Sequence, residues 1–348
     1  MHRSAGIGSI GSAAGLASKP THNLLPCIEI SYHGEGVAMR RRDVLGGLLA
    51  GTLGSTMPWR AVAVTPDDIA REYQRQAMAN FPLKLVETSG GNALAKWQEL
   101  KAAGQGTPVV LGGEDEPGHL LTPFGPNGPY VPPPRPVEDI LKDAASINFP
   151  DDILKRTKAD NAAAIRQFKE LLAAKPDMPL PTITESKDGQ TRTLTRDETV
   201  AAMLGAGREP PLGEWPDTPD TLGGLSVAID YRTGQPLEKV IIGLAPTDDW
   251  TTIPAILRWG HWNACPKPEE HVAAFRSWRD RYGAELVGMS HDVINLRVAK
   301  RPKTRDEALG LAREQYVYCP DNIEQGLGSF SALAAALMES DWWYFWWD

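Results

Sequence analysis

Two cysteines near the C-terminal end have the side chains best suited to chemistry in this chain. Cys265 and Cys319 are each followed by proline, and Asp321 comes two residues after Cys319. Together with His261 they offer thiolate, imidazole and carboxylate groups, which are all zinc ligands. Their spacing matches no established zinc pair, however, so we predict no metal. A functional cleft remains the expectation, and its candidate residues are Trp262, Asn263, Cys265, Cys319 and Asp321.

Two alternatives stay open for the pair of cysteines. An oxidising compartment favours a disulfide. A bridge between Cys265 and Cys319 would close a separation of 54 residues and stabilise the fold by roughly 4 kcal/mol on the chain-entropy model. Two separate buried thiols are the other alternative, because the sequence does not say whether the α-carbons come within about 7 Å of each other.

No catalytic motif stands out elsewhere in the sequence. Ser290-His291-Asp292 combines the residue types of a hydrolase triad, but adjacent residues on an extended chain point in different directions. We therefore interpret this stretch as a hairpin turn. Among the acids that could supply paired carboxylates for hydrolysis, we select Asp321, whose alternative role is that of a cap or turn residue. A Walker loop and a dinucleotide fingerprint are both absent from the sequence, and whether the chain is an enzyme stays open.

Tryptophan is concentrated at the C-terminal end, where eight of the eleven fall between Trp250 and Trp347. Successive side chains of a strand point to opposite faces, so Trp342, Tyr344 and Trp346 should oppose Trp343, Phe345 and Trp347. One set can fill the core. The other set is either covered by the chain itself or forms an aromatic groove for a peptide, a sugar or a protein.

The last part of the chain predicts strands and helices in mixed order. Ile294, Leu296 and Val298 alternate with polar residues, as in a strand with one buried face, and Thr304-Arg-Asp-Glu307 has the spacing of a capping box. The expected strands cover 253–259, 285–289, 293–298 and 342–347, and the expected helices cover 269–282, 304–318 and 329–338. This order predicts an α+β fold, with an antiparallel or mixed sheet and helices packed mainly on one face.

The upstream part predicts helices with few strands. The expected helices cover 67–78, 92–103, 137–145, 151–174 and 196–204, and the expected strands cover 107–111, 226–231 and 239–245. Residues 116–136 are rich in proline and glycine and are interpreted as a surface connector. We divide the chain into a helical, Pro/Gly-rich part over 64–224 and an α+β domain over 225–348.

The N-terminal region has the three parts of a signal peptide. The basic sequence Arg41-Arg42-Asp43 precedes an apolar stretch over 44–57 and a small-x-small sequence at 61–63. The paired arginines resemble the twin-arginine variant. We predict a twin-arginine-type signal peptide over 39–63, preceded over 1–38 by an extension that is not part of the native protein. The expected location is the periplasm or the cell exterior.

Charge and hydropathy narrow the range of partners. Residues 1–63 hold six of the 36 basic and three of the 44 acidic residues, so the rest has 30 basic against 41 acidic side chains and a net charge of −11. An acidic surface repels phosphate backbones, which disfavours nucleic acid as a partner. After residue 63 no apolar run is long enough to span a membrane, so a soluble protein is expected.

Four stretches together resemble one bacterial family. They are Trp262-Asn-Ala-Cys-Pro266, Tyr282-Gly-Ala-Glu-Leu286, Glu314-Gln-Tyr-Val-Tyr-Cys-Pro-Asp321 and Trp343-Tyr-Phe-Trp-Trp-Asp348. They are similar to domain of unknown function 4253, over about residues 235–348. The resemblance implies a shared fold, and it implies no activity, cofactor or catalytic residue. The family more usually has glycine at the position of His261, so no role for that histidine follows from it.

We predict an exported binding or interaction protein, because an aromatic strand is combined with a lack of catalytic motifs. The partner is expected to be a protein, a peptide or a small molecule, and no cofactor is predicted. The alternative is a hydrolase that uses Asp321 with neighbouring acids, or a metal near Cys265 and Cys319. A structural protein associated with the cell envelope is the third class.

Overall fold

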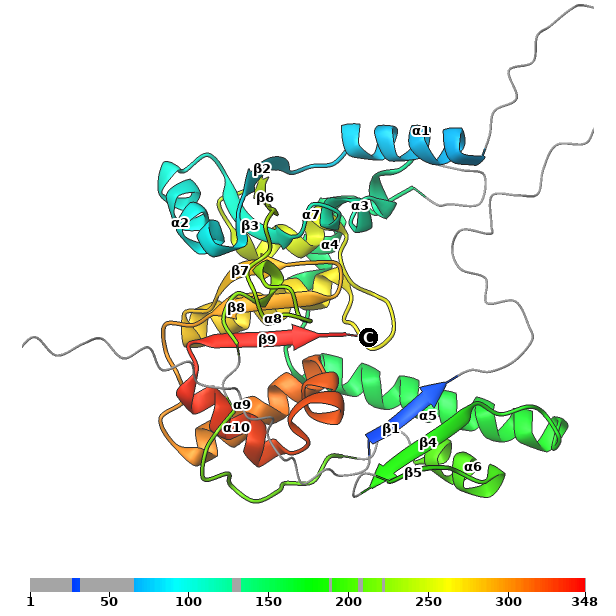
Figure 1. Ribbon diagram of the computed structural model, residues 1–348. Coiled ribbons are helices and arrows are strands. Elements are labelled where there is room, and N and C mark those ends of the chain that lie inside the picture. Colours follow the sequence, from blue (N-terminus) through cyan, green and yellow to red (C-terminus); the bar gives the residue numbers. More distant parts are fainter. Residues whose placement is uncertain are drawn as a thin grey trace, which may run out of the picture. The chain divides into compact units, whose positions relative to one another are not determined.

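The structure is a computed structural model that describes residues 27–31, 66–126, 133–187, 190–205, 209–220 and 223–347 (Figure 1). The predicted signal peptide lies outside these residues, as does the predicted extension apart from residues 27–31. The chain divides into two compact units, one within residues 1–33 and 179–200 and the other within 34–178 and 201–348. No helix of the described part is both long and apolar enough to cross a membrane.

The first unit is built on a small antiparallel sheet. Its three strands follow the order β1-β4-β5, with β1 at Cys27–Ser31, β4 at Thr182–Lys187 and β5 at Gln190–Thr193. The expected helix is α6 (Arg196–Leu204). Thr195 and Glu198 form its capping box, because each side chain accepts a hydrogen bond from the backbone N–H of the other.

The second unit is built on a mixed sheet of six strands in the order β2-β6-β3-β7-β8-β9. The pair β3–β7 is parallel and the other neighbouring pairs are antiparallel, which confirms the α+β prediction. The strands are β2 (Lys84–Thr88), β3 (Thr107–Gly112), β6 (Val240–Ala245), β7 (Glu285–Met289), β8 (Val293–Arg297) and β9 (Trp342–Trp346). Two of them, β2 and β3, precede residue 225 and pair with β6.

The helices of this unit begin and end close to their expected positions, except α3 (Glu116–His119) and α7 (Ile253–Leu257), which were not expected. They are α1 (Pro66–Ala79), α2 (Ala93–Ala103), α3 (Glu116–His119), α4 (Val137–Ala144), α5 (Asp151–Ala174), α7 (Ile253–Leu257), α8 (Pro268–Tyr282), α9 (Arg305–Tyr318) and α10 (Phe330–Glu339). The Thr304–Glu307 capping box opens α9, and the Ser329 side chain caps α10 by accepting from the N–H of Ala332. The capping residues therefore predicted the starts of these two helices correctly.

The main core lies on the face of the sheet that α7, α8, α9 and α10 cover. There Trp278 of α8 stacks on Phe345 of β9, with ring centroids 5.3 Å apart and planes at 6°. The opposite face has a smaller core, in which Trp97 of α2 packs with Val110 and Ile242. Most of the helical cover is on one face, as expected.

The expected strand over 253–259 is wrong. A 3₁₀ turn at Trp250–Thr252, which the Asp249 side chain caps, precedes this segment, and its residues 253–257 form α7. All five residues of α7 are buried, so the sequence shows a continuous apolar run with no periodicity to separate a helix from a strand. Pro254 at the helix start suits the first turn, where its missing N–H costs nothing.

The expected strand over 226–231 is wrong as well. Ser226–Ala228 is a 3₁₀ turn, followed by a single β-bridge between Ile229 and Pro236. The buried side chain of Asn295 holds the turn, because its Oδ1 accepts from the N–H of Val227 at 3.2 Å. A contact from β8, distant in sequence, therefore replaces local strand pairing here.

Candidate functional site

The loop between α7 and α8 has an unusual backbone. Arg258, His261 and Asn263 have φ values of 50°, 72° and 44°, and they are the positive-φ residues other than glycine in the described part of the chain. Such positions cost of the order of 1–3 kcal/mol each and cluster at ligand sites. Gly260 has φ 111°, and a Cβ there would lie 2.2 Å from the carbonyl oxygen of Pro266. The loop is therefore closed tightly by its own backbone.

This loop forms one wall of a cavity of about 440 Å³, which we name the Arg258 cavity. Its volume is within the range of small-molecule sites, about 300–1,000 Å³. Segments of α1, α4 and α8 and the turn after α3 complete the walls. The lining residues are Tyr73, Thr122, Pro123, Gly125, Pro126, Pro134, Arg135, Ile140, Arg258, Gly260, His261, Lys267, Pro268 and Glu269.

The Arg258 guanidinium is partly withdrawn from water and forms no ion pair, although the Glu138 carboxylate attracts it from beyond ion-pair distance. Its Nη1 donates to the carbonyl oxygen of Ile256 at 2.8 Å, and the group lies 5.4 Å from the ring centroid of Phe124. Burial lowers the pKa of Arg258. Among the described residues, no carboxylate lies within ion-pair distance (4.0 Å) of Arg258 or of Lys267. Both cations are therefore available to a ligand.

The other charges of the cavity balance one another. Arg135 pairs with Glu269 at 3.1 Å and also with Asp143 outside the lining. The cavity consequently carries a local excess of positive charge from Arg258 and Lys267, although the whole chain has a net charge of −8.

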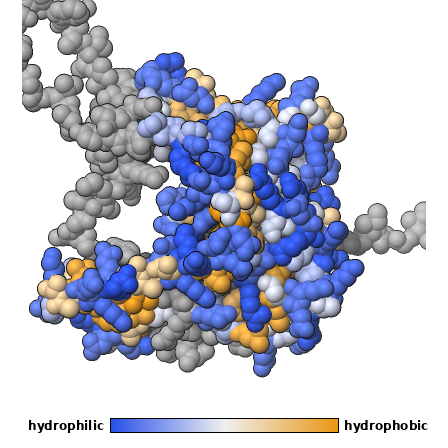
Figure 2. All heavy atoms as spheres, turned by 180° about the vertical axis from the view of Figure 1, so that it is seen from behind, coloured by the Kyte–Doolittle hydropathy of each residue, from blue (hydrophilic) through white to orange (hydrophobic). Residues whose placement is uncertain are grey.

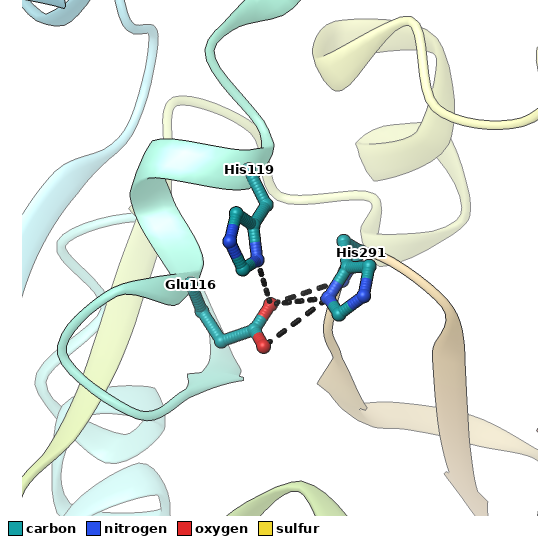
Figure 3. Close-up of side chains that lie close together, drawn as sticks. All are labelled: Glu116, His119 and His291. Carbon is teal, nitrogen blue, oxygen red and sulfur yellow. Dashed lines mark hydrogen bonds and ion pairs between the residues drawn. The ribbon is translucent and has the colours of Figure 1, made fainter. Parts of the chain in front are cut away.

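A second cluster joins α3 to the β7–β8 turn, as Figure 3 shows. Nδ1 of His291 lies 3.0 Å from Oε2 of Glu116, and Nδ1 of His119 lies 3.9 Å from the same oxygen. The two imidazole rings meet edge to face, with centroids 4.7 Å apart. The hydrogen bond to Glu116 raises the pKa of His291. Within the described residues this is the one group of three or more metal-ligating side chains whose atoms converge within 4.8 Å.

The predicted cleft residues divide between the surface and the core. Asn263 is exposed and Trp262 is half-buried, with its ring 4.8 Å from that of Trp259. Cys265 and Cys319 are both buried free thiols. None of the five candidates lines the Arg258 cavity. The residues of this loop that line it are Arg258, Gly260, His261 and Lys267.

Cys265 belongs to a buried polar chain. Its Sγ lies 3.5 Å from Nε2 of His271, whose Nδ1 lies 2.6 Å from the hydroxyl of Tyr318. Burial raises the pKa of Cys265 far above its ordinary value and lowers that of His271 to about 3. Both groups are therefore neutral at physiological pH, whereas a nucleophilic cysteine needs its thiolate form. This arrangement is that of a core network.

Cys319 and Asn322 cover the free edge of β9. The Cys319 thiol donates to the carbonyl oxygen of Trp346 at 3.1 Å, and the Asn322 amide donates to that of Tyr344 at 2.8 Å. Each cysteine thus has partners of its own and is a free thiol in this structure, and the disulfide stays one of the two alternatives. Asp321 accepts a hydrogen bond from Gln325 at 3.1 Å at the start of the π-helix 322–327, which fits the cap or turn alternative.

The two faces of β9 differ in burial. Trp343, Phe345 and Trp347 are fully buried, as expected of the core face. Trp342, Tyr344 and Trp346 are half-buried. Hydrophilic side chains predominate on the face drawn in Figure 2, and the large apolar side chains that are exposed in the described part are scattered along the chain: Met78, Leu171, Leu212, Ile229 and Tyr231.

The sequence analysis missed Arg258, Glu116 and His119 as site residues. Arg258 fell within an expected strand, and its left-handed backbone had no local signal. The pair Glu116 and His119 had one, because a three-residue spacing places both side chains on one side of a helical turn. It was overlooked since residues 116–136 were interpreted as a connector, whereas they include α3 and a 3₁₀ turn at Thr122–Phe124.

Comparisons with known proteins bear on the C-terminal part of the chain. None of the curated proteins and none of the solved structures matches it significantly. A family model matches residues 241–348. Of the residues in the two sites above, this range includes Arg258, Lys267 and His291, and it excludes Arg135, Glu116 and His119. Residues 241–348 match the model of the family described as a domain of unknown function (DUF4253), which confirms the resemblance that the sequence motifs indicated.

Proposed function

We propose that the protein is an exported binding protein and that its ligand is a small anionic molecule held in the Arg258 cavity. The observation that carries this proposal is Arg258 itself. Its guanidinium lines the cavity, is partly desolvated, and has no carboxylate partner among the described residues. Guanidinium groups bind carboxylates and phosphates with paired hydrogen bonds.

The remainder of the lining suggests the shape of the ligand. Tyr73, Ile140 and several prolines present apolar surface, while Arg258 and Lys267 supply charge. Small-molecule sites commonly combine mostly apolar walls with a few polar groups that fix orientation. We therefore expect a carboxylate or phosphate ester with an apolar part, in preference to a bare inorganic anion.

Two features support binding over hydrolysis by the residues first considered. Asp321 accepts a hydrogen bond from Gln325 and lines neither the Arg258 cavity nor the smaller cavity beside Trp97 and Trp250. Burial holds both Cys265 and Cys319 in the thiol form, because it raises the pKa of each, to about 12 for Cys319. The hydrolase alternative would need Asp321 to face a substrate cavity, or a metal ion to reach the two buried thiols.

Export is part of the proposal and is supported by the sequence of residues 39–63. Its basic, apolar and small-residue parts follow one another in the order of a signal peptide. A binding protein with a cationic cavity would then meet small anions outside the cytoplasm.

Thermal stabilisation tests the cavity. The full chain is heated at low ionic strength with phenyl phosphate, benzoate or inorganic phosphate. A ligand at one hundred times its Kd stabilises by about 2.7 kcal/mol, so phenyl phosphate or benzoate should raise Tm by several degrees. Arg258→Gln should abolish the rise, whereas Arg232→Gln, which changes an exposed arginine outside the lining, should preserve it. Equal responses of the two variants, or no response of the wild type to any probe, would contradict the proposal.

A further inference from the structure

The cluster of Glu116, His119 and His291 is built from segments that are far apart in sequence. Glu116 and His119 are the first and last residues of the four-residue helix α3, while His291 lies in the turn after β7, 175 residues beyond Glu116. Figure 3 shows the three side chains pointing toward one another. Glu116 also accepts from the backbone N–H of His291 at 3.2 Å, so the two segments are joined at backbone as well as side-chain level.

A glycine makes room for the glutamate. Gly112, at the end of β3, has φ 125°, and a Cβ at this position would lie 2.7 Å from Cγ of Glu116. The strand is irregular here, with a register shift between Val110 and Gly112. Because of this bulge and this glycine, the Glu116 carboxylate turns inward and only 18% of its side chain is exposed.

The second nitrogen of His291 faces another carboxylate. Its Nε2 lies 3.5 Å from Oδ2 of Asp292, and Oδ1 of Asp292 accepts from the hydroxyl of Ser290 at 2.8 Å. The indole N–H of Trp259 in turn donates to the carbonyl oxygen of Ser290 at 2.9 Å. Metal-bound histidines commonly donate their other N–H to a carboxylate of this kind, which fixes the ring and its tautomer.

We infer that Glu116, His119 and His291 form a binding site for a divalent transition-metal ion, with zinc as the best match. Two imidazoles and one carboxylate are a donor set that zinc accepts, and imidazole also suits cobalt and nickel, whereas calcium and magnesium prefer oxygen donors. The side chains of His119 and His291 are 55% and 45% exposed. Water can therefore reach the ion and complete its coordination.

A proton is the competing occupant of this cluster. Protonated His291 could bridge Glu116 and Asp292 as a plain ion pair, which would need no metal and would leave His119 without a role. The two accounts differ over His119, which lies 3.9 Å from Glu116 and meets His291 through its ring. A metal site requires His119 as a ligand; an ion pair does not.

Zinc titration of the full chain separates the two accounts. The protein is stripped with a chelator, dialysed and titrated with zinc chloride by isothermal titration calorimetry. His119→Ala and His291→Ala are compared with Glu99→Ala, which removes an exposed carboxylate of α2 outside the cluster and outside the Arg258 cavity. Circular dichroism without metal verifies that each variant folds, and Tm measured with and without zinc gives a second readout of binding.

The inference predicts one zinc site that is lost or at least tenfold weaker in His119→Ala and in His291→Ala and unchanged in Glu99→Ala. Asp292→Asn should weaken zinc binding by about tenfold, as expected for a carboxylate that orients a ligand. Zinc should raise Tm in the wild type and in Glu99→Ala but not in the two ligand variants. A wild type that binds no zinc, or a His119→Ala variant with wild-type affinity, would overturn the inference.

Discussion

Nδ1 of His271 lies 2.6 Å from the hydroxyl oxygen of Tyr318, and both side chains are fully buried. The rings of Trp259 and Trp347 pack against the same imidazole, with centroids 4.7 and 5.8 Å away. The network ties α8, α9 and β9 together beneath the loop that carries Arg258. Because it contains a titratable group in an apolar core, it makes stability depend on pH.

Stability should fall with decreasing pH because of His271. Its pKa is lowered to about 3 by burial, so below about pH 6.5 the unfolded chain binds a proton that the folded chain does not. The free energy of unfolding should decrease between about pH 6.5 and pH 3, with a slope from this group of up to about 1.4 kcal/mol per pH unit. Urea unfolding at several pH values should show a shallower slope in His271→Gln. Identical slopes in variant and wild type would refute the assignment.

Gly260→Ala should destabilise the protein by more than about 1 kcal/mol. Its Cβ would lie 2.2 Å from the oxygen of Pro266 and 2.8 Å from Nε2 of His271, at a φ of 111°. Gly310→Ala is the matched control, since this exposed glycine of α9 has open space around it. The control should gain about 0.5–1 kcal/mol from helix propensity. Chemical denaturation measures both, and a neutral Gly260→Ala would show that the loop is not tightly closed.

Asn322→Ala should cost about 1–3 kcal/mol, because it leaves the carbonyl of Tyr344 without its donor at the edge of β9. Gln325→Ala is the control on the same π-helix, where the lost partner is Asp321 in an exposed hydrogen bond. This change should stay within about 0.5 kcal/mol. Equal effects of the two substitutions on urea unfolding would mean that the edge carbonyl is solvated.

Replacing Arg41 and Arg42 together by lysine should block export. The prediction is that the wild type reaches the periplasm with its leader removed, while the double variant remains in the cytoplasm at full length. Immunoblotting of cell fractions measures both. An equal distribution of the two proteins would argue against a twin-arginine signal, although it would leave the Arg258 cavity proposal untouched.

The elements that the sequence predicted well are those with local chemical signals. Thr304 and Ser329 cap their helices through contacts three residues away. The alternation of Ile294 and Leu296 with polar residues correctly identified the side of β8 that faces the main core. Such signals need no knowledge of the rest of the chain. The expectation of a wet opposite face is wrong at Asn295, whose side chain is fully buried against the 3₁₀ turn at Ser226–Ala228.

The features that were missed depend on contacts between distant segments. Strand β2 was not expected from the sequence. Its residues Lys84–Thr88 pair with Val240–Ala245, more than 150 residues away, so no local signal marks the strand. The meeting of Glu116 with His291 arises from the parallel pairing of β3 with β7. The left-handed backbone of Arg258 ends α7, a helix whose five residues are all buried. It therefore also depends on tertiary packing. Trp262, Asn263 and Cys265 belong to the loop that lines the Arg258 cavity, but the cavity opens beside other side chains of that loop. Cys319 and Asp321 lie elsewhere, after α9.

The most direct test of the central claim is a calorimetric titration of the full chain, freed of bound ligand by dialysis. The titrant is the anion that gives the largest rise in Tm. A hydrogen-bonded contact to a charged group contributes about 1.5–3 kcal/mol, and 1.4 kcal/mol corresponds to a tenfold change in Kd. The account predicts one binding site whose Kd rises at least tenfold in Arg258→Gln and remains unchanged in Arg232→Gln. An unchanged Kd in Arg258→Gln would contradict it.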